Sequence, residues 1–129
     1  MLGLAVAGVW EARSAAQDHV QAEAQALHEI YERVRVYPPD VRDRIRADVD
    51  AYAKQVVDKE WKVMADKGRL TPQGADLLAR IREDVTDYEP KTDFQAQAYQ
   101  PLVDQVAAVE SARALRDWST AATWSTSGW

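Results

Sequence analysis

The most regular hydrophobic pattern of the chain lies between Pro39 and Asp66 and predicts a helix. Its apolar residues recur every three or four positions, which is the period of one face of an α-helix. They are Val41, Ile45, Val49, Tyr52 and Val56, and a second stripe beside them consists of Ala53, Val57, Trp61 and Met64. Two adjacent stripes form an apolar arc that can contact several neighbours, as in a central helix of a bundle. We therefore expect Trp61 to be buried and to anchor the fold.

Three other segments have the same helical period. The first extends from Glu11 to about Val36, and its apolar positions are Ala16, Val20, Ala24, Leu27, Tyr31 and Val34. The next is shorter, and its face consists of Leu77 or Leu78 with Ile81, Val85 and Tyr88. The last has a stripe of Phe94, Ala98, Leu102, Val106, Val109 and Leu115. Pro101 falls inside this last helix, where it should kink the helix or mark a short lead-in.

Local signals mark the ends of these four helices. A residue before proline is displaced from the helical region, so the first helix should end at Tyr37 and the second begin near Pro39. Gly68 is a candidate left-handed cap, and Thr71 is an N-cap followed by proline.

The third helix should close before Pro90, and Thr92 with Gln95 resembles a capping box that opens the fourth. Short connections between long helices make neighbours antiparallel. The sequence therefore predicts an all-α fold, an up-down-up-down four-helix bundle with a long first hairpin.

The two ends of the chain differ from this pattern. Residues 1–10 are uncharged and mostly apolar, about half of the roughly 20 residues that cross a bilayer. They are either the start of a buried helix or the last turns of a membrane helix. Residues 118–129 are rich in Ser and Thr and have no clear period, which predicts a frayed, flexible tail. The expected organisation is a lead-in over 1–10, a bundle over 11–117 and a tail over 118–129.

Four of the five tryptophans should lie at one end of such a bundle, because its first and last helices share that end. They are Trp10, Trp118, Trp124 and Trp129. Tryptophan is favoured at membrane–water interfaces, where its apolar ring and single N–H suit the headgroup layer. This favours proximity to a membrane; the alternative is that the tail is simply disordered.

Composition excludes several classes of function. The 129 residues suit one domain, and the absence of cysteine excludes thiol catalysis and thiolate metal sites. Seven basic and seven acidic residues are interleaved between Tyr37 and Lys67, although nucleic-acid binding requires an unbalanced basic face. We therefore expect no nucleic-acid partner.

The sequence offers no convergent set of catalytic residues, and we expect no catalytic activity and no cofactor. His19 and Glu23 are four residues apart, as are His28 and Glu32, a spacing that can place two metal ligands on one face. Both histidines are on one helix without an evident third ligand, so we expect no metal site.

Glu23 and Glu60 are carboxylates beside core positions, where a charge is costly unless it is paired. We hypothesise that one of them ties helices together through an arginine, for which Arg113 of the fourth helix is a candidate. A proton relay or ion path is the alternative role for these carboxylates. A separation of more than about 8 Å between Arg113 and both carboxylates would eliminate the pairing.

Particular residues of three helices resemble a known family. They are Ala22-Glu23-Ala24-Gln25-Ala26-Leu27 and Tyr31 in the first helix, Tyr52, Val56-Val57 and Glu60-Trp61 in the second, and Arg113 and Arg116 in the fourth. This succession, over roughly Val9 to Arg116, resembles the bestrophin-like domain proteins, a group of bacterial membrane proteins. The resemblance implies a helical soluble domain between membrane helices and, by analogy with bestrophin anion channels, a channel-like assembly. Family members typically continue past the arginine pair into a Leu-Pro turn and further membrane helices, whereas Asp117, Trp118 and a polar tail follow here.

Two classes of function follow. The first is the soluble helical domain of a bestrophin-like membrane protein, on the cytoplasmic side, which serves assembly or regulation next to the bilayer. Its partners would be other copies in a homo-oligomer, the membrane helices of a longer protein or the bilayer interface. The second is a free-standing helical interaction module, which predicts an exposed apolar face along the side of the bundle.

Overall fold

The computed structural model describes the backbone of residues 19–127 and the side chains of residues 19–117. All regular structure in this part of the chain is helical, which confirms the all-α class. The first helix is described from residue 19 to residue 33 and continues into a 3₁₀ turn, η1 (Val34–Val36). It is followed by α2 (Pro39–Gln55), the π-helical segment η2 (Val56–Glu60), α3 (Trp61–Lys67), α4 (Pro72–Asp87) and α5 (Asp93–Ser127).

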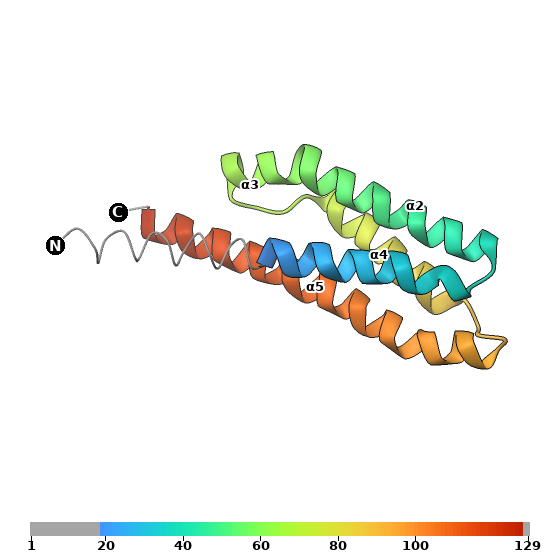
Figure 1. Cartoon of the computed structure of the whole chain (residues 1–129). Helices are drawn as coiled ribbons and strands as arrows, with labels where there is room; N and C mark the ends of the chain where they lie inside the picture. Colours follow the sequence, from blue (N-terminus) through green and yellow to red (C-terminus); the bar gives the residue numbers. More distant parts are fainter. Residues whose placement is uncertain (1–18, 128–129) are drawn as a thin grey trace.

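Figure 1 shows that the chain reverses direction at each of its three connections. The segments α2, η2 and α3 form one long rod, so the described part of the chain has four helical rods. The described part of the first helix starts, and α5 ends, at the end of the molecule where α3 lies. Among the described residues, no helix combines the length and the apolarity needed to cross a membrane.

The predicted ends of the second and third helices are confirmed. Tyr37 is extended, with φ −84° and ψ 161°, and α2 begins at Pro39. Gly68 has φ 65° and caps α3 by donating its N–H to the carbonyl of Met64 at 3.0 Å. A left-handed residue at this place favours glycine, which carries no Cβ. The Thr71 hydroxyl accepts a hydrogen bond from the Gly74 N–H at 3.1 Å and caps α4.

The predicted capping box at the start of α5 forms in part, because the side chain of Gln95 accepts from the N–H of Lys91 and not from that of Thr92. The N–H of Gln95 donates to the Thr92 hydroxyl at 3.1 Å, and its side-chain oxygen accepts from the N–H of Lys91 at 2.8 Å. The same oxygen accepts from the Tyr88 hydroxyl at 2.7 Å, and the amide nitrogen donates to the Val36 carbonyl at 3.2 Å. One side chain therefore joins η1, the end of α4 and the start of α5.

The helix α5 continues through Pro101 and past Asp117 to Ser127. Its backbone is thus helical over residues 118–127, where the sequence shows no period. The side chains of Trp118 and Trp124 lie outside the described part, as do Trp10, Trp129 and the whole apolar lead-in 1–10. The frayed tail and the tryptophan cluster therefore stay predictions.

The core lies between the helices and uses most positions of the predicted stripes. The stripe of the first helix is wrong in part, because Ala24 is exposed and Ala26 and Ile30, which it did not include, are buried. Its fully buried apolar side chains are Ile30, Val34, Ile45, Tyr52, Ile81, Val85, Leu102, Val106 and Val109. Two residues of the fourth stripe are wrong: Phe94 is 75% exposed, and Leu115 is 42% exposed. Each is displaced by a polar neighbour that faces inward, Gln95 in the first case and Arg116 in the second. Consecutive helical residues are about 100° apart, so Phe94 and Leu115 point away from the core when Gln95 and Arg116 face it.

The prediction that Trp61 is a buried anchor is wrong, because 43% of it is exposed. Val57 of the same stripe is also exposed. The inward face follows steps of four instead, through Tyr52, Val56 and Glu60. In an α-helix each step of four drifts by about 40°. The wider π-helical turn η2 offsets this drift, so Glu60 still faces inward and Trp61 does not.

Replacing Trp61 by Ala should therefore cost only about 1 kcal/mol of the free energy of unfolding, since much of its surface already contacts water. Ile81→Ala in α4 removes a fully buried side chain and should cost about 2–5 kcal/mol. Urea denaturation of both variants checks the comparison. Equal destabilisation by the two substitutions would contradict the exposed position of Trp61.

Candidate functional site

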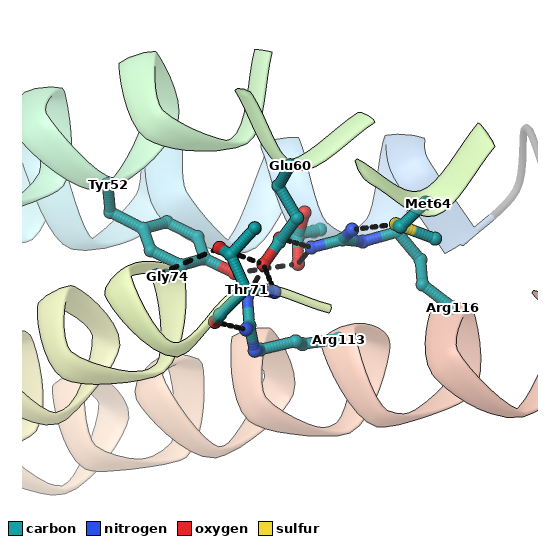
Figure 2. Close-up of polar contacts among 8 residues, drawn as sticks. Tyr52, Glu60, Met64, Thr71, Gly74, Arg113 and Arg116 are labelled. Atoms are coloured by element: carbon teal, nitrogen blue, oxygen red, sulfur yellow. Dashed lines mark hydrogen bonds and ion pairs between the residues drawn. The ribbon is translucent and has the colours of Figure 1, made fainter. Parts of the chain in front are cut away.

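A group of charged and polar side chains is buried near the α3 end of the molecule (Figures 1 and 2). Its members come from all four rods: Glu23 from the first helix, Tyr52 from α2, Glu60 from η2, Thr71 from the cap of α4, and Arg113 and Arg116 from α5. We call these six residues the Glu–Arg cluster. Each is at most 7% exposed, and charged side chains are almost never buried this far without partners.

Glu60 lies at the centre of the Glu–Arg cluster, as Figure 2 shows. Its Oε1 atom accepts hydrogen bonds from the backbone N–H of Thr71 at 3.0 Å and from the Thr71 hydroxyl at 2.9 Å. Its Oε2 atom accepts from Arg113 at 2.8 Å and from Arg116 at 2.9 Å. Both oxygens of this completely buried carboxylate are therefore satisfied.

These contacts determine the ionisation of Glu60. Burial alone would raise its pKa, because a low-polarity interior disfavours the charged form. The hydrogen bond from the Thr71 N–H, the hydrogen bond from Arg116 and the charge of Arg113 outweigh burial, and the pKa of Glu60 is lowered. Glu60 is thus held in the ionised form.

Arg116 joins the two carboxylates of the cluster. Its Nη2 atom donates to Glu23 at 3.0 Å and to Glu60 at 2.9 Å, and its Nη1 atom contacts the sulfur of Met64 at 3.0 Å. Burial would lower the pKa of Arg116, but the charge of Glu23 and the hydrogen bonds to both carboxylates raise it. With two glutamates and two arginines, the cluster is balanced in charge.

Tyr52 and Arg113 complete the contacts between rods. The Tyr52 hydroxyl donates to Glu23 at 3.1 Å, and burial with the nearby Glu23 charge raises the pKa of Tyr52 to about 12. Arg113 donates from Nη2 to the Thr71 carbonyl at 2.9 Å, in addition to its bond to Glu60. Through these bonds α5 is tied to α2, η2 and the start of α4.

Gly74 leaves the space that the cluster occupies on the α4 side. A Cβ atom at this position would lie 2.6 Å from Oε1 of Glu60, 2.7 Å from Nη1 of Arg113 and 3.0 Å from the Thr71 hydroxyl. The first two separations are shorter than any van der Waals contact. Glycine is therefore required here by close approach and not by backbone conformation.

The pairing predicted for Arg113 is confirmed for Glu60, at 2.8 Å, while Glu23 pairs with Arg116 instead. Thr71, Gly74 and Arg116 were not predicted to belong to a site. Arg116 follows Arg113 by three residues, a spacing that puts both on one face of a helix and was a usable signal.

The other residues singled out from the sequence lie outside the cluster. Leu27 is buried in the core, and Tyr31 packs under Arg46, whose guanidinium carbon is 4.7 Å from the ring centre. His28 and Glu32 are exposed, and the carboxylate of Glu23 is engaged by Tyr52 and Arg116. Across residues 19–127, no three His, Asp or Glu side chains are grouped as metal ligands.

An apolar groove lies beside the Glu–Arg cluster, between the first helix and the α2–α3 rod. Its volume is about 150 Å³, and it is lined by Val20, Glu23, Ala24, Leu27, Ala53, Val56, Val57 and Trp61. The exposed side chains of Val57 and Trp61 form part of its wall. Ala53, Val57 and Trp61 of the second predicted stripe therefore face this groove instead of the core, and Met64 of the same stripe contacts Arg116.

Comparison with known proteins yields one match. The family model described as Bestrophin-like domain matches residues 1–129, the whole chain. No curated protein and no solved structure matches it. The resemblance that the glutamates, Tyr52 and the arginine pair suggested is thereby confirmed: the chain belongs to the Bestrophin-like domain family.

Proposed function

We propose that this chain is the helical domain of a bestrophin-like membrane protein and serves assembly or regulation next to the bilayer, without catalysis. The observation that carries the proposal is the position of the Glu–Arg cluster. It joins Glu23 of the first helix to Arg116 of α5, and Arg116 also contacts Met64 of α3.

The chemistry of the cluster suits a structural connector. Breaking a buried ion pair is strongly destabilising, yet an intact pair adds little net stability compared with apolar packing. What such a pair supplies is a defined geometry, because each guanidinium must meet its carboxylates at fixed positions. Here it fixes the first helix relative to α5, the two helices through which adjoining segments would be positioned.

Two separate observations, the family of the chain and its tryptophan residues, support the proposed location next to a membrane. Membership of the Bestrophin-like domain family suggests membrane association. Trp10, Trp118, Trp124 and Trp129 are residues of the kind that line a membrane interface. The proposed partners are membrane helices or the bilayer interface, with the domain on the cytoplasmic side and in a homo-oligomer.

Light scattering over a concentration series, together with flotation on vesicles of phosphatidylcholine and phosphatidylglycerol, tests this proposal. We expect a closed homo-oligomer, vesicle binding, or both. Replacing Trp118 and Trp124 together by Ser should weaken vesicle binding, whereas Phe94→Ser, which changes an exposed aromatic residue of the first α5 turn, should not. A chain that stays monomeric and does not bind vesicles would contradict the proposal.

The exposed groove favours a second candidate, a free-standing module that binds the apolar side of another helix. Exposed aromatic and apolar side chains beside a groove are typical of helix-in-groove recognition. The combined change Val57→Ser and Trp61→Ser separates the two candidates. Loss of self-association in this variant, with vesicle binding retained, would favour the interaction module and would locate its binding surface at this groove.

A further inference from the structure

A second buried acidic group lies in α2, away from the Glu–Arg cluster. Asp48 is 7% exposed, and within the described part of the chain no hydrogen-bond donor reaches its Oδ2 atom. Its carboxyl group faces the side chain of Asp84, a half-buried residue of α4. The helices α2 and α4 pack directly against each other, so this acidic pair lies in their interface.

Two ionised carboxylates cannot hydrogen-bond to each other, because neither has a proton to donate. With one proton the same pair forms an O–H···O⁻ bond, which is shorter and stronger than a neutral one. Burial, the hydrogen bond with Asp84 and the charge of Asp84 raise the pKa of Asp48 to about 7. The charged groups that face it are Asp84 and Arg80 from α4 and Arg44 from α2, and the two arginines oppose this rise.

We propose that Asp48 and Asp84 form a proton-binding site in the α2–α4 interface, in which the two carboxyl groups share one proton. Loss of this proton as the solution becomes alkaline leaves two carboxylates facing each other and weakens the contact between α2 and α4. The proposal is independent of the membrane function and of the Glu–Arg cluster.

The direction of the pH effect follows from linkage. A carboxyl group whose pKa is raised by folding binds its proton more tightly in the folded state than in the unfolded state. Its stabilising contribution is complete below the ordinary pKa of 3.8, declines as the pH rises, and is lost above about 7. Between about pH 5 and pH 8, the equilibrium constant of unfolding should rise by tenfold to about a hundredfold.

Urea denaturation at several pH values in this range tests the proposal on three proteins. The wild type should become less stable as the pH rises, while Asp48→Asn, which keeps the shape and carries no titrating group, should lose most of this dependence. Asp50→Asn is the matched control, because Asp50 is an exposed aspartate of the same helix. Parallel pH profiles of the wild type and Asp48→Asn would overturn the proposal.

Infrared spectroscopy supplies a readout that does not depend on unfolding. At about pH 6 the folded wild type should show the C=O stretch of a protonated carboxyl group, and Asp48→Asn should lack it. Asp84→Asn should move the midpoint of this band to lower pH, since it removes a like charge and its amide can donate to ionised Asp48. A band that is unchanged in both variants would place the proton elsewhere and overturn the assignment.

Discussion

Replacing Glu60 by Gln is expected to lower the free energy of unfolding by about 3–5 kcal/mol, the cost of breaking a buried ion pair. The substitution keeps the shape of the side chain but removes one negative charge. The buried Arg113 and Arg116 are then left with the carboxylate of Glu23 as the remaining negative charge of the cluster. Urea denaturation measures the effect. A loss of this size is a large part of the free energy of unfolding of a typical domain, about 5–15 kcal/mol. Partial unfolding of the variant at room temperature would therefore also agree with this prediction.

The matched control is Glu110→Gln. Glu110 of α5 also pairs with an arginine of another helix, Arg82 of α4, but both partners are more than a third exposed. Surface ion pairs contribute about 0–1 kcal/mol, so this variant should stay close to the wild type. Equal effects of Glu60→Gln and Glu110→Gln would show that burial does not strengthen the cluster.

Acid unfolding gives a second measure of Glu60. Its pKa is lower in the folded state than its ordinary value of 4.5, so its contribution to stability is present above that value and is lost as the pH falls through the folded pKa. The wild type should therefore lose stability on acidification below about pH 4.5, and Glu60→Gln should lose less.

Gly74→Ala is expected to destabilise the protein by about 1–3 kcal/mol, the usual cost of overpacking. The sign is unusual, because Ala in place of Gly within a helix normally stabilises by about 0.5–1 kcal/mol. The added methyl group would overlap Glu60 and Arg113, whose positions are fixed by hydrogen bonds of 2.8–3.0 Å. These side chains can move aside only by giving up those bonds.

Thermal unfolding of Gly74→Ala beside Ala75→Ser checks this expectation. Ala75 is the next residue of α4 and is exposed, so one added atom there should change the stability by less than about 0.5 kcal/mol. A Gly74→Ala variant more stable than the wild type would contradict this expectation, because Glu60 and Arg113 could then move aside without loss of stability.

Features that depend on neighbours in the sequence were predictable. The ends of the helices at Tyr37, Gly68, Thr71 and Gln95 follow from proline geometry, left-handed glycine and side-chain caps, all of which act within a few residues. The core stripes of α2 and α4 followed from the helical period for the same reason.

Features that depend on distant residues were not predictable in full. In the sequence, a charged residue at position 60 indicates the end of an apolar stripe. Glu60 nevertheless faces inward, because two arginines more than fifty residues later in the chain neutralise it. The π-helical turn that keeps it there leaves no recognisable local pattern. Trp61 is therefore partly exposed, although its place in the second apolar stripe had predicted a buried position.

The acidic pair shows the same limit. Asp48 follows Ile45 by three residues and could be read as a polar position at the edge of the apolar face. Its burial results from the packing of α4 on α2, and its partner Asp84 is 36 positions later in the chain. Spacing within one helix carries no information on such a pair.

The order in which the ribosome makes the chain gives the Glu–Arg cluster one further consequence. Both glutamates are synthesised long before Arg113 and Arg116, the residues that neutralise them. Until α5 leaves the ribosome, closing the first three rods would bury two unpaired carboxylates, which is strongly unfavourable. The bundle should therefore close in one late step, and a nascent chain that stops before Arg113 should remain open to proteases and chaperones.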